Sequence, residues 1–496
     1  MAEKQMKKLA KDTAIYGISS ILGKFLNWLL VPLYTYLLES SADYGVVTNL
    51  YSWTALLLVI LTYGMETGFF RFANKNKENS AEVYSTSMIS VGVTSLIFAS
   101  LCLFFSQQIA DSLGYSAYPE YISMLGVVVA IDAFASIPFA YLRFINRPLK
   151  FAAIKFLYVA LNILFNIFFL VVCPWLMKFA PATVEWFYNP HYGVGYVFVS
   201  NILSTSIQTL ALLPYIFNIK FRFNPGLLKN LLRYSLPLLV LGVAGIMNQT
   251  LDKILYPFLR TGVEGAAELG IYGATSKIAL IMLMFTQAFR YAYEPFIFAQ
   301  HKDKESLTAY ADAMKFFIIF SLLIFLGMTL YIDIFKYFIQ RDYWVGLKVV
   351  PVVLWSFIFQ GVFFNLSLWY KLTDKTMYGA WFSVIGTVII VVGNVIFVPR
   401  FGYVGSAWAA FACYLVIMLI SYYFGQKYMP IKYDLKTIAL YSVLTLVLYY
   451  ISTYIKTPYQ VLNIVLKSIL MLIFVVLLVK RDFPLKNIPY INRFIK

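Results

Sequence analysis

The sequence predicts an all-α polytopic membrane protein with 14 transmembrane helices, arranged as two six-helix lobes in a parallel repeat plus two C-terminal helices. Three observations predict this fold. Hydrophobic residues make up 61% of the 496 and charged residues only 13%, a balance foreign to soluble globular proteins. Apolar stretches of about 20 residues, the length that crosses a bilayer as a helix, recur along the chain. Similar short patterns also return about 225 residues apart.

The apolar stretches give the expected spans in chain order. They lie at 12–38, 43–71, 81–107, 118–143, 151–178, 194–217, 230–258, 267–299, 306–332, 346–370, 377–398, 403–426, 434–455 and 459–479. The connections between them are short, and none could hold a soluble domain with its own core. We therefore expect an N-lobe at 1–222 and a C-lobe at 223–430. Residues 431–496 hold the last two helices and a cytoplasmic tail.

Lysine and arginine placement predicts the topology, because such residues concentrate in cytoplasmic connections. They gather at the N-terminus and in alternate connections: Arg71, Lys75 and Lys77; Arg143, Arg147 and Lys150; Lys220, Arg222 and Lys229; Lys302 and Lys304; Lys371 and Lys375; Lys427, Lys432 and Lys436. The connection with Lys336, Arg341 and Lys348 is the exception. Both termini are expected in the cytoplasm. The net charge of +17 is then mostly an orientation signal and an attraction to anionic lipids, not a sign of nucleic-acid binding.

The sequence offers little material for metal or histidine chemistry. Cys102, Cys173 and Cys413 are dispersed over apolar spans, and the two histidines, His191 and His301, are expected on opposite sides of the membrane. No Walker A pattern appears, so transport driven by ATP would need another chain. No cleavage site follows the first apolar run, so we expect that span to be retained. We expect no metal and no cofactor.

An internal repeat relates spans 1–6 to spans 7–12. The matched pairs are Asp43-Tyr44-Gly45 with Glu268-Leu269-Gly270; Ser80, Tyr84 and Met88 with Ser306, Tyr310 and Met314; Arg143 and Arg147 with Lys371 and Lys375; Asn166 with Asn394; and Gly195-Tyr196-Val197 with Gly402-Tyr403-Val404. Because six spans are an even number, the two copies share one orientation. Such repeats are related by an axis along the membrane normal, with the substrate site between them.

The first hundred residues carry a more specific pattern. The first span ends in Val31-Pro32-Leu33-Tyr34-Thr35, the second begins at Asp43-Tyr44-Gly45, and it closes with Gly64-Met65-Glu66 and Phe70-Arg71-Phe72. With six plus six plus two spans, this resembles the multidrug/oligosaccharidyl-lipid/polysaccharide (MOP) exporter superfamily. Within it the chain is most similar to the polysaccharide transporter branch that includes the O-antigen flippases.

The resemblance implies a function. It implies that the protein moves an undecaprenyl-pyrophosphate-linked oligosaccharide outward across the bacterial cell inner membrane by alternating access, for polysaccharide, O-antigen and hence lipopolysaccharide biosynthesis. The implied partners are this lipid-linked substrate, membrane lipids and other polysaccharide-assembly proteins. It also implies a transporter and not an enzyme. Coupling to Na⁺, to H⁺ or to the membrane potential stays open.

We single out eight charged residues inside expected spans, and each is a functional-site hypothesis because a charge at the bilayer centre costs at least about 3 kcal/mol. They are Lys24, Glu66, Asp132, Asp252, Lys253, Lys277, Arg290 and Glu294. Four are positive and four negative, so the span interiors are expected to be close to neutral. This balance argues against a simple cationic cavity.

The eighth span is the richest in polar groups. Gln287, Arg290 and Glu294 share one helical face, and Pro295 is expected to kink or unwind the helix next to them. Arg290 and Glu294 could equally pair with each other within the helix. Related lipid II flippases of the superfamily hold a pyrophosphate with cations from helices 1, 2 and 8. By position, the resemblance implies that Lys24, Arg71 and Arg290 bind the substrate pyrophosphate.

The remaining charges have open alternatives. Glu66, Asp132, Asp252, Lys253, Lys277 and Glu294 are candidate cavity counter-ions or coupling sites, and structural pairing between helices explains each of them equally well. Because adjacent residues point about 100° apart on a helix, at most one of Asp252 and Lys253 is expected to face the cavity centre. Arg143, Arg147 and Lys155 form either a basic cytoplasmic entrance for an anionic headgroup or a topology signal.

Two other functions compete with the flippase. An ion-coupled small-molecule exporter could use the same scaffold, although the first span lacks the coupling carboxylate typical of drug exporters in the superfamily. A membrane glycan polymerase would need an outward loop with convergent charged residues. The longest such loop, 178–194, offers little beyond Glu185 and His191.

Overall fold

The computed structural model describes residues 17, 21–75, 77–217, 221–300 and 306–483, and the side chains of 292, 294–300 and 306 are also outside the described part. Within these ranges, 12 helices are long and apolar enough to cross a membrane, or 13 if one bent pair counts as a span. The expected count of 14 is therefore not reached. The start of the first expected span, at 12–38, lies largely outside the described residues, and its described part, Ile21–Leu37, is shorter than a full span.

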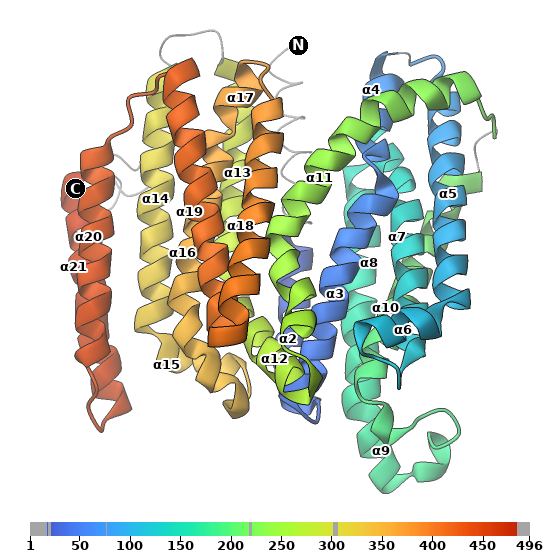
Figure 1. The fold of residues 1–496 in the computed structure, drawn as a ribbon, viewed down its shortest axis with the longest axis horizontal. Coiled ribbons are helices and arrows are strands. Elements are labelled where there is room, and N and C mark those ends of the chain that lie inside the picture. Colours follow the sequence, from blue (N-terminus) through green and yellow to red (C-terminus); the bar gives the residue numbers. More distant parts are fainter. Residues whose placement is uncertain (1–16, 18–20, 76, 218–220, 301–305, 484–496) are drawn as a thin grey trace.

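One group of helices comes from the first half of the chain (Figure 1). Its members are α2 (Leu30–Leu37), α3 (Ser41–Thr62), α4 (Met65–Lys75), α5 (Ser80–Phe104), α6 (Ser106–Leu113), α7 (Pro119–Phe144), α8 (Pro148–Ile167), α9 (Cys173–Phe179) and α10 (Val194–Phe217). Helix α7 packs against α5, and α10 packs against both α7 and α8. Helices α3 and α4 form one span, interrupted where Tyr63 and Gly64 adopt left-handed backbone conformations.

The second group has a corresponding order. Its members are α12 (Gly262–Ile278), α13 (Leu280–Gln300), α14 (Ser306–Leu330), α15 (Ile332–Phe335), α16 (Val350–Leu366), α17 (Leu368–Leu372), α18 (Met377–Phe401) and α19 (Tyr403–Tyr428). Here α16 packs against α14, and α19 packs against α16 and α18. The last two helices, α20 (Leu435–Tyr454) and α21 (Gln460–Arg481), stand at one side of the molecule and pack on α14 (Figure 1).

Residues paired by the sequence repeat have matching local structures. Asn166 and Asn394 are both fully buried, and each donates its side-chain amide to the carbonyl four residues earlier, at 2.7 and 2.8 Å. The turns after α7 and α17 also match. Asn146 has a φ of 52° and Asp374 a φ of 56°, both left-handed conformations that suit a short polar side chain. The two copies of the repeat therefore match in individual turns and in the hydrogen bonds of buried amides.

Helix α11 (Pro225–Leu259) links the two groups. It runs obliquely from the upper end of the first group to the lower end of the second (Figure 1). It packs against α3, α4 and α5 of the first group and against α12, α18 and α19 of the second. The expected lobe boundary at 222/223 assigns this whole helix to the C-lobe, whereas its contacts are divided between both groups.

The two groups also meet directly, at the lower ends of α3 and α12. A Cβ atom on Gly45 would overlap the carbonyl oxygen of Ala266, and one on Gly270 would overlap that of Ser41. Small residues at a helix crossing allow the backbones to approach closely. Gly45 and Gly270 are repeat partners, so this crossing is formed by equivalent positions of the two copies.

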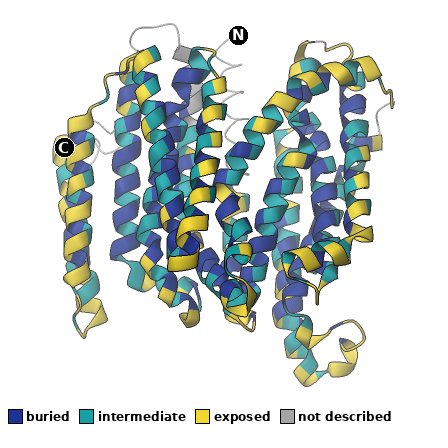
Figure 2. Ribbon diagram, viewed as in Figure 1, coloured by how far each residue is buried: buried dark blue, intermediate teal, exposed yellow. Residues whose placement is uncertain are grey.

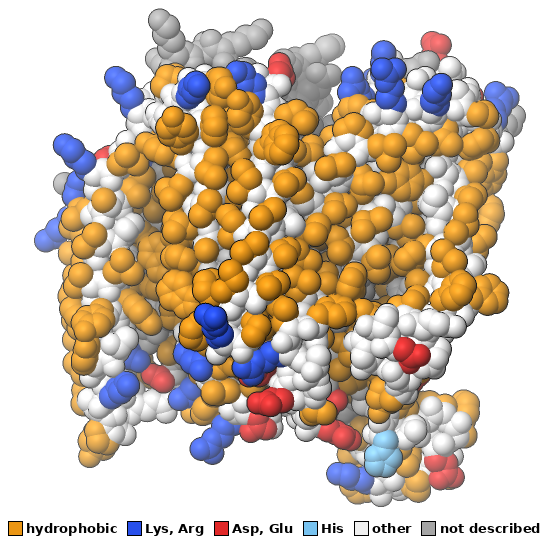
Figure 3. All heavy atoms as spheres, in the orientation of Figure 1, with side chains coloured by type: hydrophobic (Ala, Val, Ile, Leu, Met, Phe, Trp, Pro, Cys, Tyr) orange, Lys and Arg blue, Asp and Glu red, His pale blue; other side chains and the backbone are white. Residues whose placement is uncertain are grey.

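Burial and charge follow the arrangement expected in a bilayer. Buried residues lie along the facing sides of the helices, while α20 and α21 carry many exposed residues (Figure 2). The face seen in Figure 3 shows a broad hydrophobic surface, with Lys and Arg along its upper edge and both signs of charge near its lower edge. The protein is a multi-pass membrane protein.

Candidate functional site

A break between α12 and α13 is the centre of the candidate site. The two helices are bent by 44° between Ile278 and Leu280. The indole Nε1 of Trp28 donates a hydrogen bond to the carbonyl oxygen of Lys277 at 2.6 Å, so a group from the first helix satisfies a carbonyl at the end of α12. This hydrogen bond places the first helix against the end of α12, next to the break.

This break lies away from Pro295, where a kink or unwinding was expected. Helix α13 continues past Pro295 to Gln300, so it is not unwound there. Proline removes one backbone hydrogen bond and need not end a helix, whereas the carbonyl at Lys277 is captured by a side chain from another helix. A tertiary contact, which local sequence does not reveal, thus lies at the break.

Four cations lie around this break, and we call Lys24, Lys253, Lys277 and Arg290 the cationic cluster. Lys24 is exposed and close enough to Arg290 for their charges to repel. Lys277 is also exposed, and its charge interacts in the same way with Lys253. The guanidinium of Arg290 lies 4.8 Å from the centre of the Phe364 ring. The first helix and α13 thus contribute one pair of neighbouring cations, and α11 and α12 contribute another.

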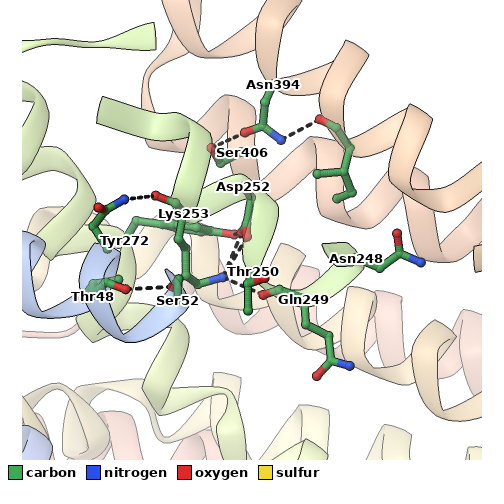
Figure 4. A network of polar contacts seen from close by, with 12 residues as sticks. Thr48, Ser52, Asn248, Gln249, Thr250, Asp252, Lys253, Tyr272, Asn394 and Ser406 are labelled. Atoms are coloured by element: carbon green, nitrogen blue, oxygen red, sulfur yellow. Dashed lines mark hydrogen bonds and ion pairs between the residues drawn. The ribbon is translucent and has the colours of Figure 1, made fainter. Parts of the chain in front are cut away.

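Among the described side chains next to the cationic cluster, Asp252 supplies a carboxylate (Figure 4). It is 3% exposed, and its oxygens lie 2.9 and 3.0 Å from the Lys253 ammonium. The Tyr272 hydroxyl donates to the same carboxylate at 2.8 Å. Adjacent side chains were expected to diverge, but Lys253 folds back onto its neighbour. A buried carboxylate needs this pairing because an unpaired buried charge is very unfavourable.

The same network ties α11 to both groups. The side-chain amide of Asn49, on α3, donates to the Lys253 carbonyl at 2.8 Å. On the other side, the Thr387 hydroxyl donates to Asn248 at 3.0 Å, and the Tyr414 hydroxyl donates to the Asn248 carbonyl at 3.1 Å. Helix α11 is therefore hydrogen-bonded to α3, α18 and α19 within two turns of Asp252.

The other two expected counter-ions are paired elsewhere. Glu66, on α4, forms an ion pair with Arg143 at the end of α7. Asp132, on α7, interacts electrostatically with Lys155 on α8, whose ammonium also lies 4.0 Å from the centre of the Phe139 ring. Both carboxylates therefore have their partners within the first helix group.

The remaining expected site residues lie apart from the cluster. Arg71 is exposed on α4, where its guanidinium stacks 4.2 Å from the centre of the Tyr234 ring, and none of its described interactions involves Lys24 or Arg290. Arg147 is exposed at the start of α8. The side chain of Glu294 lies outside the described residues. Of the three residues expected to bind pyrophosphate, the structure brings Lys24 and Arg290 together.

This placement changes the expected charge balance. With Glu66 and Asp132 paired in the first helix group, the described side chains around the break are four cations and one carboxylate, Asp252. The described side chains around the break thus carry more positive than negative charge, and Glu294, which the expected balance included, has its side chain outside the described residues. Within the described residues, no group of three or more His, Cys, Asp or Glu side chains could hold a metal ion.

Two charged residues escaped the sequence reasoning. Lys467 lies inside the last expected span and is 7% exposed, with its ammonium 2.7 Å from Asp333. It belonged to the same category as the eight intramembrane charges, so scanning every span for charge would have found it. Asp333 sits in a connection, where sequence gives no sign of a buried partner.

Solved structures share this fold. The inward closed conformation of the lipid II flippase MurJ matches with a TM-score of 0.73 and 14% identity, over 95% of this chain and 98% of that one. An inward-facing multidrug resistance MATE family transporter of the MOP superfamily matches with a TM-score of 0.63 and 15% identity, over 87% and 96%. A MOP superfamily transporter from Pyrococcus furiosus matches with a TM-score of 0.54 and 15% identity, over 84% and 95%. No curated protein sequence matches the chain.

The fold is therefore that of the MOP superfamily of membrane transporters. The sequence narrows this class further, because residues 9–298 match the family described as polysaccharide biosynthesis protein. The chain belongs to that family. The resemblance found in the first hundred residues is confirmed.

Proposed function

We propose that the protein is a flippase that carries an undecaprenyl-pyrophosphate-linked oligosaccharide from the cytoplasmic to the outer leaflet of the bacterial inner membrane. The observation that carries the proposal is the cationic cluster at the break between α12 and α13, in a member of the polysaccharide biosynthesis family. Lys277 is exposed although it lies within a span. An exposed charge at that depth is stable next to water or an anion, not next to lipid.

The pyrophosphate is the part of this substrate that suits the cluster. Like charges held close together repel, and an anion between them converts that repulsion into attraction. The guanidinium of Arg290 can bind two phosphate oxygens at once, while Lys24 supplies a compact charge beside it. Lys277, at the C-terminus of α12, and Lys253 continue the positive region. Arg71 acts earlier in this scheme, near the cytoplasmic entrance with Arg143, Arg147 and Lys155.

Alternating access in this proposal depends on the contacts between the two helix groups. In the described state, the Gly45 and Gly270 crossing holds the lower ends together. Transport requires this crossing to separate while the upper ends approach. Helix α11, bonded to both groups near Asp252, is the element that must bend or slide during the change.

Deleting the gene and locating the lipid-linked glycans tests the function. Loss of a flippase leaves single repeat units on the lipid carrier, facing the cytoplasm. Loss of a polymerase leaves them facing outward, and loss of a small-molecule exporter changes drug sensitivity alone. Only the first result supports the proposal. Either of the others contradicts it.

A further inference from the structure

A second basic region lies at the opposite end of the molecule from the α7–α8 turn. A pocket of about 680 Å³ is lined by the α14–α16 connection, the start of α16 and the α20–α21 turn. In Figure 1 these segments form the lower left corner, next to α15. The pocket contains the connection that departs from the alternating charge pattern of the sequence, because Lys336 and Lys348 both line it.

The pocket has more positive than negative charge. Its lining includes four lysines and one carboxylate: Lys336, Lys348, Lys456, Lys467 and Asp333. Asp333 is shared between two of the lysines, with Lys467 at 2.7 Å and Lys336 at 3.5 Å. Lys348 and Lys456 are exposed and form no ion pair with any described acidic residue, and the Lys348 ammonium lies 5.2 Å from the centre of the Tyr403 ring. Two of the four ammonium groups thus remain available to an anion.

A helix N-terminus adds to this positive potential. Helix α21 begins at Gln460, which lines the pocket, and its first turn contains no acidic residue. The residue before it, Tyr459, provides no side-chain cap, so the first backbone N–H groups have no side-chain acceptor. Such groups and the helix dipole favour a bound anion. This end of α21 therefore reinforces the lysines.

The rest of the lining suggests how the anion is attached. Ile332, Leu347, Val350, Tyr449 and Ile455 form an apolar wall beside the lysines. The wall continues into the side of the membrane-spanning helices α14, α16 and α20, whereas the charged part lies at their ends. A ligand with a phosphate at one end and an apolar remainder matches both parts.

We propose that this pocket is a phosphate-binding site, separate from the cationic cluster. Lys348 and Lys456 contact two phosphate oxygens, backbone N–H groups in the first turn of α21 donate to a third, and the Asp333–Lys467 pair lies behind them. The same chemistry is presented by the headgroup of an anionic phospholipid and by a soluble phosphate or pyrophosphate. A phosphate group bound in this pocket links the α20–α21 pair to the second helix group, because its ligands come from both. The proposal stands whether or not the protein is a flippase.

The test compares two double variants of the full chain. K348Q/K456Q removes the two exposed lysines of the pocket. K178Q/R341Q removes two exposed cations from the same end of the molecule that do not line the pocket. Native mass spectrometry of the purified protein measures binding of phosphatidylglycerol, of phosphatidylcholine as the zwitterionic comparison, and of inorganic pyrophosphate without lipid. All four substituted residues are exposed, so both variants should fold.

We expect the wild type and K178Q/R341Q to retain phosphatidylglycerol more strongly than phosphatidylcholine, and K348Q/K456Q to lose about tenfold in that affinity. If pyrophosphate binds the wild type, and K348Q/K456Q weakens it equally, the phosphate source is soluble and the site still holds. Equal retention of both lipids by the wild type, with no pyrophosphate binding, overturns the proposal. So does an equal loss in the two double variants.

Discussion

At the scale of single residues, the structure separates two uses of charge. The pairs Glu66–Arg143 and Asp252–Lys253 bring opposite charges together within or beside one helix group. Lys24, Lys277 and Arg290 instead lie near other cations. Paired opposite charges stabilise the fold locally, while neighbouring like charges repel one another and attract an anion. Substituting a cation of the cluster should therefore impair transport, whereas substituting a paired carboxylate should reduce stability.

Removing a cation from the cluster should impair transport without unfolding the protein. We expect Lys24→Ala and Arg290→Ala each to reduce surface-glycan export about tenfold or more, because a charged hydrogen bond contributes about 1.5–3 kcal/mol. Arg290→Lys should retain part of the activity, since it keeps the charge but not the guanidinium fork. The control is Lys178→Ala, an exposed cation far from the cluster. Full export by both alanine variants at normal protein levels contradicts the site assignment.

Removing the buried carboxylate should instead reduce stability. Asp252→Asn leaves the Lys253 ammonium without its partner, and breaking a buried pair costs about 3–5 kcal/mol. Tyr272→Phe deletes one hydrogen bond to the same carboxylate and should cost about 1 kcal/mol. Thermal unfolding of the purified variants measures both. An Asp252→Asn midpoint at or above that of Tyr272→Phe refutes this ranking.

At the scale of elements, the contact between α3 and α12 sets the described conformation. Their backbones approach closely because glycine occupies both repeat-related positions, 45 and 270. Any side chain there must push the helices apart. The crossing closes the lower end, so its substitution should favour a state in which that end is open.

Gly45→Val should raise the accessibility of the α3–α12 contact. A cysteine at Thr48, which faces Gly273 across the contact, reports the change through an impermeant maleimide. The three native cysteines are buried, so background labelling should be low. Gly245→Val is the matched control, because a Cβ at that helical glycine meets no atom within 4 Å. Equal labelling in the two variants means that the crossing does not hold the lower end closed.

The attachment of α21 should depend on pH through Asp333. Burial alone would raise the pKa of this carboxyl, but the hydrogen bond and charge of Lys467, with the charge of Lys336, lower its pKa below the usual aspartate value. Its contribution to stability is therefore complete above about pH 4 and is lost as the pH falls further. The side chain is 40% exposed, so the contribution is about 1 kcal/mol or less.

Hydrogen exchange of α21 measures this contribution. Exchange in the wild type should increase as the pH falls below about 4, after correction for the intrinsic rate. Asp333→Asn should exchange faster at neutral pH and show no further acid effect. A parallel pH response in the two proteins shows that Asp333 does not hold the helix.

At the scale of the whole molecule, the sequence predicted the helical fold and its repeat well. Hydropathy predicts spans directly, and repeated residues such as Asn166 and Asn394 indicate equivalent packing in the two copies. The sequence could not reveal which helices are neighbours. Glu66, left open as a counter-ion, a coupling site or a structural partner, pairs with Arg143, and Trp28 from another helix contacts the carbonyl of Lys277 at the break. Partners across helices depend on tertiary arrangement, which a single sequence does not encode locally.

Transport by the purified protein tests the central proposal most directly. The full chain is reconstituted into vesicles with a labelled undecaprenyl-pyrophosphate-linked oligosaccharide, and a membrane-impermeant reagent measures the outward-facing headgroups over time. We expect wild-type protein to expose the inner-leaflet headgroups to the reagent, and K24A/R290A to leave them protected as in protein-free vesicles. Protection in wild-type vesicles, or equal exposure by wild type and K24A/R290A, contradicts a flippase that holds its substrate by the cationic cluster.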